Sequence, residues 1–251
     1  MRATVFLALW NGVDTAQVTP EEYETWHSFE HVPERVGLPG FIEARRYRRL
    51  DDAAGAGALY YTCYGLQSRE ALATPEYREV LAQPTPWSAR MRGALTDFLR
   101  LPCELQGAYG VSSGVYLSAL RLRATNATAI TASLTSMLPA LVAEAGVLCA
   151  HWGWAYPTND FPMASAGVTP VEGNGQEAVL MVQHLDLTTL RISTEYLQRV
   201  LGLRAVMCQR MGDYGLLTHV RQTDLTAPLE QRQPARPQLM QRFLSGDKVH
   251  G

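Results

Sequence analysis

Apolar and polar residues along this chain repeat with periods of about two and about 3.6 residues, which are typical of strands and of amphipathic helices. In the first part of the chain they predict a strand, a helix, a strand hairpin, a helical region and a last strand. The expected ranges are 3–10, 20–36, 41–50 with 58–65, 68–82 with 87–98, and 99–105. The Thr-Pro-Glu-Glu run at 19–22 supports the first helix, because it combines an N-cap, a first-turn proline and acidic side chains.

The second part of the chain predicts the same order of elements. Its strands and helices are expected at 114–123, 126–145, 148–156, 177–186, 188–201 and 204–210, with a long hairpin connection at 157–176. Short motifs repeat as well: C-x-x-x-G-x-Y-G occupies 103–110 and returns at 208–215. The Pro-to-Gly spacing at 33–40 returns at 139–146. Such self-similarity at a fixed period indicates an internal duplication.

Each half therefore predicts the strand-helix-strand-strand-helix-strand order of ferredoxin-like domains. A sheet of this kind carries helices on one face, and its bare apolar face must be covered. We predict an α+β fold in which two tandem ferredoxin-like repeats pack sheet to sheet and close a barrel within one chain. The expected domains are a first repeat at 1–108, which holds the active half, a degenerate second repeat at 109–225 and a C-terminal tail or arm at 226–251. A short helix at 237–245 is a candidate to pack on a partner subunit, so we expect a homodimer.

Composition excludes several classes of function. The chain has 251 residues, of which 47% are hydrophobic, with a formal net charge of -2 and a pI near 6.3. These values argue against nucleic acid or an anionic membrane as a partner, because both attract basic patches. Lys248 is the sole lysine, which excludes Schiff-base chemistry and a P-loop. We find no signal peptide and no apolar run near the ~18 residues of a membrane span, so we expect a cytoplasmic protein.

The sequence does not indicate a disulfide framework or a metal centre. The cysteines at 63, 103, 149 and 208 form no C-x-x-C pair and are predicted to be buried thiols. The spacing His27-x-x-x-His31-x-x-Glu34 suits a metal, but the glutamate that directly follows the first histidine in zinc proteases is absent. We therefore predict neither a metal nor a cofactor, and we keep a haem or metal site as an alternative.

One stretch of the chain is similar to a known family. Residues 26–35 read W-H-S-F-E-H-V-P-E-R, followed by L-P-G-F at 38–41 and A-R-R-Y at 44–47. This pattern resembles the dimeric α+β-barrel superfamily, in particular its EthD-like members. The resemblance covers the first half well and the second half only through the repeat. It implies a small-molecule site beside the sheet, often with a histidine from the first helix. It does not imply one reaction, because the superfamily includes isomerases, cyclases, cofactor-free monooxygenases and haem enzymes.

The first helix carries the residues best suited to acid–base chemistry. On a helical wheel, Trp26 lies on the apolar seam, where it is expected to contact substrate. His27 and Glu30 share an adjoining strip, and His31 lies just beyond it. A carboxylate beside an imidazole can orient it and tune its pKa towards neutrality. The alternative is a flank that faces solvent. The matching helix of the second half is small and apolar, which favours a single polar site in the first half.

The strands that follow supply the other candidates. Arg45 and Tyr47 share one face of their strand, and Arg45 is our choice to bind a carboxylate or an enolate-like oxygen. Tyr60 and Cys63 on the next strand, together with Trp152 in the second half, are predicted to line a pocket for a flat substrate. The alternative is that these side chains fill the core.

These observations predict a cofactor-independent lyase or isomerase that moves a proton next to the carbonyl of a small aromatic or lactone-type metabolite. His31 or His27 is the expected base or acid, Glu30 its orienting partner and Arg45 the group that stabilises negative charge. The motif favours His31 and the wheel favours His27, so both stay open. A cofactor-free monooxygenase is a close relative of this prediction. The alternatives are a haem- or metal-binding oxidoreductase or dehydratase, and a non-catalytic small-molecule-binding protein.

Overall fold

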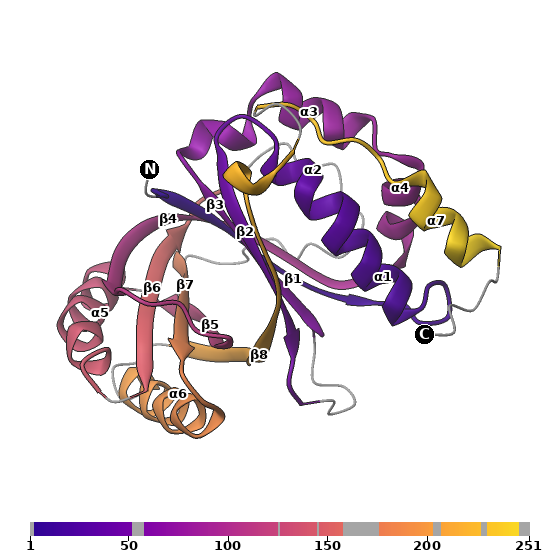
Figure 1. Ribbon diagram of the computed structural model, residues 1–251. Coiled ribbons are helices and arrows are strands. Elements are labelled where there is room, and N and C mark those ends of the chain that lie inside the picture. Colours follow the sequence, from indigo (N-terminus) through magenta and orange to yellow (C-terminus); the bar gives the residue numbers. More distant parts are fainter. Residues whose placement is uncertain are drawn as a thin grey trace.

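Eight antiparallel strands form a closed barrel (Figure 1). The computed structural model describes residues 3–51, 58–124, 126–144, 146–157, 176–202, 207–226 and 230–245. The strands are β1 (Val5–Val13), β2 (Phe41–Arg49), β3 (Tyr60–Leu66), β4 (Leu95–Gly110), β5 (Tyr116–Ala124), β6 (Val147–Ala155), β7 (Gln176–His184) and β8 (Met207–Arg221). Around the barrel they follow the order β1-β3-β2-β8-β5-β7-β6-β4. The prediction of an α+β barrel that closes within one chain is confirmed.

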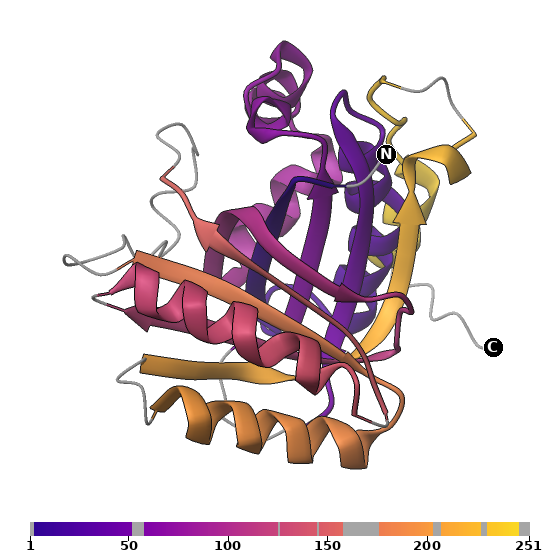
Figure 2. The same ribbon diagram turned by 90° about the vertical axis from the view of Figure 1, so that its left-hand side faces the viewer.

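Helices cover the outside of the barrel in two groups. The first group is α1 (Pro20–Trp26), a π-helical turn η1 (His27–His31), α2 (Val32–Val36), a 3-10 turn η2 (Arg69–Leu72), α3 (Pro75–Ala82) and α4 (Pro86–Ala94). The second group is α5 (Ala127–Leu141) and α6 (Leu187–Gly202), and Figure 2 faces this side. A further 3-10 turn, η3 (Gln222–Asp224), follows β8. Threonine caps followed by proline begin α1, α3 and α4, because this pair satisfies a free N–H and presets the helical φ.

Two seams of hydrogen bonds join the halves of the barrel, one between β2 and β8 and one between β4 and β6. The first part of β4 pairs with β1, and its last part pairs with β6. In the same way β8 passes from β5 to β2. The sequence predicts shorter strands at 99–105 and 204–210, because the pattern within one half does not reveal pairing with the other half.

Alternation along the strands creates three apolar layers. On β1, Phe6, Ala8 and Trp10 belong to the core inside the barrel, whereas Val5 and Leu7 pack towards the first group of helices. Side chains of both halves fill the barrel, and each half has its own core beneath its helices. Neighbouring residues on a strand therefore lie on opposite sides of the sheet. This decides which candidate residues can meet.

The C-terminal arm, residues 230–245, runs over the first group of helices (Figure 1). It ends in α7 (Pro237–Leu244), whose Leu239, Met240 and Phe243 pack on the core that contains Trp87. The Phe243 and Trp87 ring centroids are 6.0 Å apart. The helix expected on a partner subunit thus packs on its own chain, because the surface beside α1 and α4 is apolar enough to accept its apolar face.

Two further expectations concern segments between and within the elements. The hairpin connection predicted at 157–176 lies almost entirely outside the described residues. Among the helices that the structure describes, none combines the length and the apolar composition needed to cross a bilayer.

Candidate functional site

A cavity of about 70 Å³ lies between the sheet of the first half and its helices. The sequence-predicted Trp26, His27 and His31 meet there. Its lining is mostly apolar, and the other residues with polar groups that line it are Asn11, Tyr23, Arg35, Tyr64, Tyr77, Ser88, Arg92 and Arg100. A volume of this size holds several water molecules. A ring-sized ligand therefore requires the covering helices to move outward.

The two histidines begin and end a π-helical turn. η1 spans His27–His31, and the backbone N–H of Val32 donates to the His27 carbonyl. Pro33 accounts for the turn, because it has no N–H to donate to the carbonyl four residues earlier and its ring would clash there. The change in the backbone hydrogen-bond pattern rotates the side chains relative to a regular helix. The structure buries His27 against Trp26. This burial agrees with the helical wheel, which places His27 nearer the apolar seam than His31. Turns of this kind are frequent at functional sites.

A chain of polar contacts that starts in the sheet holds His27. Its Nδ1 lies 2.8 Å from the Tyr23 hydroxyl. The Asn11 Nδ2 donates to the same hydroxyl oxygen over 2.8 Å, and the hydroxyl lies 3.1 Å from Asn11 Oδ1. Burial lowers the pKa of His27 well below its usual value, and the positive charge of Arg46 lowers it further. The imidazole is therefore neutral at pH 7 and fixed in orientation.

His31 faces the cavity from the end of the same turn. Its ring packs on Trp26 with centroids 4.6 Å apart and meets the His27 ring edge-on at 5.1 Å. Its Nδ1 is buried and has no hydrogen-bond partner among the described residues. Burial lowers the pKa of His31 well below its usual value, and nearby arginines, Arg35 first, lower it further. A neutral imidazole with a free nitrogen is able to accept a proton from a bound molecule.

Arginines place positive charge around the histidines. Arg46 is fully buried, with its guanidinium 5.6 Å from the ring centroids of both Tyr23 and Tyr60. It donates to the Ser28 hydroxyl over 2.6 Å. Arg92 reaches the cavity from α4 and donates to two backbone carbonyls near the end of α3, and burial lowers its pKa. Such surroundings favour a ligand that carries or develops negative charge.

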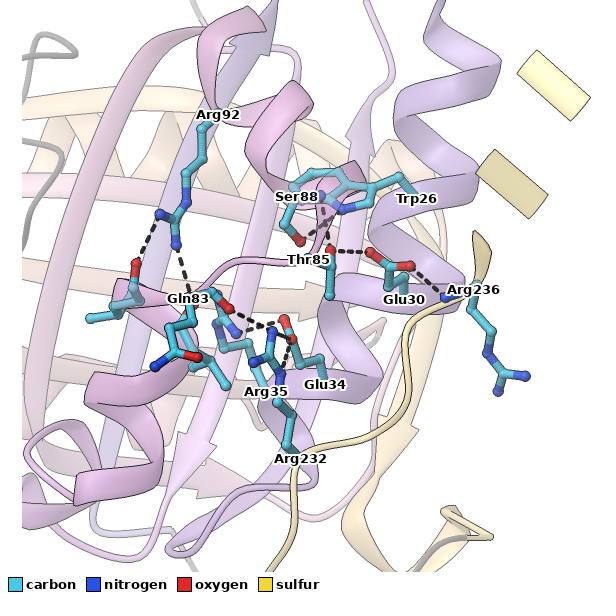
Figure 3. Close-up of polar contacts among 12 residues, drawn as sticks. Trp26, Glu30, Glu34, Arg35, Gln83, Thr85, Ser88, Arg92, Arg232 and Arg236 are labelled. Atoms are coloured by element: carbon cyan, nitrogen blue, oxygen red, sulfur yellow. Dashed lines mark hydrogen bonds and ion pairs between the residues drawn. The ribbon is translucent and has the colours of Figure 1, made fainter. Parts of the chain in front are cut away.

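Glu30, the predicted orienting partner of the histidines, instead contacts two other segments (Figure 3). One carboxylate oxygen accepts a hydrogen bond from the Thr85 hydroxyl over 2.5 Å, and the other accepts from the Arg236 backbone N–H over 2.6 Å. Glu30 therefore ties η1 to the start of α4 and to the C-terminal arm. The sequence assigned Glu30 to orient a histidine, but in the structure the Tyr23 hydroxyl contacts His27 instead. Tyr23 stands four residues before His27, so helical spacing could have indicated it.

Glu34 is the second carboxylate that the arm uses (Figure 3). It is 1% exposed and forms ion pairs with Arg35 over 2.7 Å and with Arg232 over 2.6 Å. Arg232 also donates to the Gln83 carbonyl at the end of α3 over 2.9 Å. One arginine of the arm thus joins α2 to α3 across the outside of the cavity. Outward movement of these helices has to break this contact.

The sheet separates three other predicted residues from the histidines. Arg45, Tyr47 and Cys63 line a different cavity inside the barrel. Alternation places Arg46 on the helix side, so it takes the position beside the histidines that the sequence assigned to Arg45. Tyr60 also lies on the helix side, where its hydroxyl donates to a carboxylate of α1 over 3.0 Å. The alternation was predicted correctly, but the face that meets the histidines was not.

Trp152 lies far from the histidine cavity in the fold. It is 1% exposed in the core beneath α5 and α6 of the second half. The expectation that it contacts substrate with the first-half residues is therefore corrected, because on β6 the alternation sends His151 and not Trp152 towards the barrel interior.

The residues present do not fit a haem. Both imidazoles pack against Trp26 instead of facing a flat slot. Within the described ranges, no three side chains of His, Cys, Asp or Glu gather as a metal site. We therefore derive no chemical step through such a group.

Comparison with known proteins rests on structure alone, since no family model and no curated protein matches the chain. An anthrone oxidase-like protein aligns with 91% of this chain and 98% of its own, at a TM-score of 0.62 and 12% identity. The protein has an α+β-barrel fold. A candidate monooxygenase from Fusobacterium nucleatum aligns with 93% of this chain and 100% of its own, at a TM-score of 0.51 and 12% identity. A candidate chlorite dismutase covers 87% and 96%, at 0.50 and 11%. Likeness at this identity shows the fold, and chemistry has to be argued from the site.

Proposed function

We propose that this protein is a cofactor-independent enzyme that removes a proton next to the carbonyl or phenol group of a small metabolite, in the cavity between the first-half sheet and its helices. The single observation that carries the proposal is the buried, neutral His31, whose free Nδ1 lies among arginines. The imidazole is unprotonated at neutral pH, which is the form that a general base requires, and the surrounding positive charge stabilises the substrate anion that remains after proton transfer.

The two histidines take different roles in this proposal. His31 receives the C–H proton, and the electron pair of that bond moves to the substrate oxygen to form an enolate. In this proposal the single proton of the Tyr23 hydroxyl goes to His27 Nδ1 and not to Asn11 Oδ1, while Asn11 Nδ2 donates to the hydroxyl oxygen. His27 then carries its own proton on Nε2 and offers it to the enolate oxygen. Arg92 adds positive charge there, in place of the Arg45 chosen from the sequence.

The fate of the enolate defines the reaction. Return of the proton to a different carbon gives an isomerase, and departure of a leaving group from the neighbouring carbon gives a lyase. These are the reactions that we propose first. The mostly apolar lining of the cavity suits them, because it excludes water from the charged intermediate.

A monooxygenase is the second candidate, and the descriptions of two structural neighbours support it. The neighbours described as an anthrone oxidase-like protein and a candidate monooxygenase have similar structures. In such a reaction the carbanion supplies electrons to O₂, a CH₂ group becomes a carbonyl and the second oxygen atom leaves as water. The first step is the same proton transfer to His31. The two candidates therefore differ only in whether O₂ is consumed.

One experiment separates the candidates. A panel of one-ring phenols, ketones and lactones is incubated with the protein in D₂O without O₂, and loss of C–H signals is followed by NMR. We expect exchange with the native chain and a loss of 100-fold or more, on the ~10²–10⁴ scale of acid–base catalysis, with His31→Gln. His219→Gln, on β8, is the matched control. Oxygen uptake after air is admitted indicates the monooxygenase. Unchanged exchange in His31→Gln contradicts the proposed base.

The organisation of the chain is part of the same proposal. Both halves have the strand order expected of ferredoxin-like sheets, β4-β1-β3-β2 and β8-β5-β7-β6. Gly40 and Gly146, which match in the sequence repeat, both have positive φ, at 80° and 90°. These facts support two tandem repeats with the predicted domain limits. An EthD-like relationship, a homodimer and a cytoplasmic location also remain proposals, and light scattering at several concentrations tests the homodimer.

A further inference from the structure

A second cavity opens at the end of the barrel where β1 begins and β4 ends. Its volume is about 460 Å³, and residues of both halves line it. Arg45 and Cys63 come from β2 and β3, and His151 and Gln183 come from β6 and β7. The sheet separates this cavity from the histidines, and the proposed reaction uses none of these side chains.

Arg45 is the positive group of this cavity. Its Nε is buried and has no hydrogen-bond partner among the described residues. Its ion pair with Glu43 is long, with Nη2 and Oε1 3.4 Å apart, and the other Glu43 oxygen lies 2.9 Å from His219 Nε2. The positive charge acts on the pKa values of Tyr47 and three further groups around it, which are Cys63, Cys149 and His151. Arg45 therefore lies near all four of these groups, and its Nε–H is available to donate to a ligand.

Apart from Arg45 and the Glu43 carboxylate beside it, the titratable groups that line the cavity are neutral at pH 7. Burial lowers the pKa of His151. Burial also raises the pKa of the Cys63 thiol to about 12 and that of Cys149 to about 11. The Gly114 N–H donates to Gln183 Oε1 over 2.8 Å, so the amide nitrogen of this glutamine stays available as a donor. An anion entering the cavity meets one guanidinium, which also contacts the Glu43 carboxylate, and neutral donors.

The inner surface of the cavity is apolar. Phe6, Tyr47 and Met181 line it and belong to the core inside the barrel, and the Met181 sulfur accepts a hydrogen bond from the Tyr61 hydroxyl over 2.9 Å. These groups suit the body of a flat organic molecule. We propose that the barrel cavity is a second binding site, which takes a small carboxylate with an apolar body, its carboxylate on Arg45 and its body on Phe6, Tyr47 and Met181.

Methionine methyl groups report on the two cavities separately. Met181 lines the barrel cavity, whereas Met91 packs in the core with Trp26 beside the histidine cavity. Protein labelled with ¹³C-methyl methionine is titrated with 2-naphthoate, and Met181→Leu assigns the reporting signal. We expect a saturable shift of the Met181 methyl group while the Met91 signal stays in place.

The charge of the ligand and the charge of Arg45 are then removed in turn. 2-Naphthamide has the same shape without the charge, and we expect its dissociation constant at Met181 to be at least tenfold higher. Arg45→Gln is expected to weaken 2-naphthoate binding at least tenfold, because a charge-assisted contact is lost, and Arg45→Lys to restore part of it. His31→Gln leaves binding at Met181 unchanged, so failure of the proposed reaction does not affect this test.

Three results overturn the proposal. They are the absence of a Met181 shift at millimolar 2-naphthoate, equal affinity for the amide and the acid, and unchanged affinity in folded Arg45→Gln. The comparison of the two ligands uses the native chain, so it decides the question even if Arg45→Gln does not fold.

Discussion

The Tyr23 hydroxyl lies 2.8 Å from Nδ1 of His27, and both side chains are buried. Tyr23 belongs to the regular helix α1, whereas His27 begins the π-helical turn. The contact therefore links the position of the imidazole to the sheet through Asn11 on β1. Tyr23 exchanges no proton with the substrate in the proposed mechanism. It nevertheless sets the orientation of His27, which donates to the substrate oxygen.

Removing the Tyr23 hydroxyl tests this link. Tyr23→Phe leaves the ring in place but frees His27 Nδ1 and leaves Asn11 with an unmet hydrogen bond. We expect the rate of proton exchange to fall about tenfold, the scale of one lost hydrogen bond, with a smaller effect on substrate affinity. Tyr196→Phe is the control, since this tyrosine is 41% exposed on α6. Equal rates in native protein and Tyr23→Phe would show that His27 is positioned without this hydroxyl.

The stability of the fold is expected to fall in mild acid. Burial lowers the folded-state pKa values of His27, His31 and His151, and that of His184 to about 4. The unfolded chain, with histidine pKa near ~6.5, binds more protons below that pH. The free energy of unfolding therefore decreases as pH falls from 7.5 to 5.5, by up to ~1.4 kcal/mol per pH unit for each histidine. Urea unfolding at several pH values measures the slope.

Replacing one of these histidines should reduce that slope. His151→Gln removes a titrating group that makes no contact with the histidine cavity. The slope of the free energy of unfolding against pH should therefore decrease by the contribution of one histidine. A free energy of unfolding that stays constant between pH 7.5 and 5.5 would contradict the assignment of neutral buried imidazoles.

Glu34 is expected to be the most sensitive carboxylate of the first helix. Glu34→Gln leaves Arg35 and Arg232 without the buried charge that they share, and breaking a buried pair in this way costs ~3–5 kcal/mol. Glu21→Gln in the exposed first turn of α1 is the matched control, with an expected change within ~0.5 kcal/mol. Urea unfolding of both variants provides the comparison, and similar midpoints would show that the ion pairs contribute little.

The arm contact is expected to control opening of the histidine cavity. Arg232→Ala removes the bridge between Glu34 and the end of α3, so amide hydrogen exchange in η1 and α2 should accelerate, while exchange in the second-half core stays constant. Arg242→Ala, an exposed arginine on α7, serves as the control. Equal exchange in both variants would show that α7 packing alone holds the arm.

Two glycines give opposite predictions. Gly40 has a φ of 80°, and an added Cβ would lie 2.7 Å from the Ala71 Cβ. Gly40→Ala should therefore destabilise the fold by about 2 kcal/mol or more, since both strain and overlap oppose it. Gly93 is an exposed residue of α4 with no atom within 4 Å of an added Cβ. Gly93→Ala should stabilise by ~0.5–1 kcal/mol, because alanine loses less backbone freedom in a helix. Thermal unfolding compares the two directly.

The strand and helix order could be predicted from the sequence because it depends on local periods and caps. Thr19 and Pro20 start α1 as their chemistry indicates. The chain repeat also gave sufficient reason to expect a closed barrel. The pairing between the two halves of the barrel could not be predicted. Tyr214–Arg221 of β8 pairs with β2, which lies in the first fifty residues, and contacts between such distant segments leave no local pattern in the sequence.

The candidate site could be predicted only in part. His27, His31 and Trp26 were identified because their helix is amphipathic and rich in titratable groups. Periodicity shows that Arg45 and Arg46 face opposite sides of the strand but not which side holds the histidine cavity, so the sequence could not decide between them. The partner of Glu30 in the C-terminal arm could not be predicted, because it is more than 200 residues away in sequence.

Closure of the barrel by one covalent chain, through the β2–β8 and β4–β6 seams, has a consequence for how such a protein evolves. Forming the barrel is unimolecular, so dilution does not open it. Among the described residues, every strand of the barrel is paired on both sides, so the ring offers no open strand edge to other chains. Because two different segments build the two halves, a substitution in one is not copied into the other. Each half is therefore free to change its polar residues independently of the other.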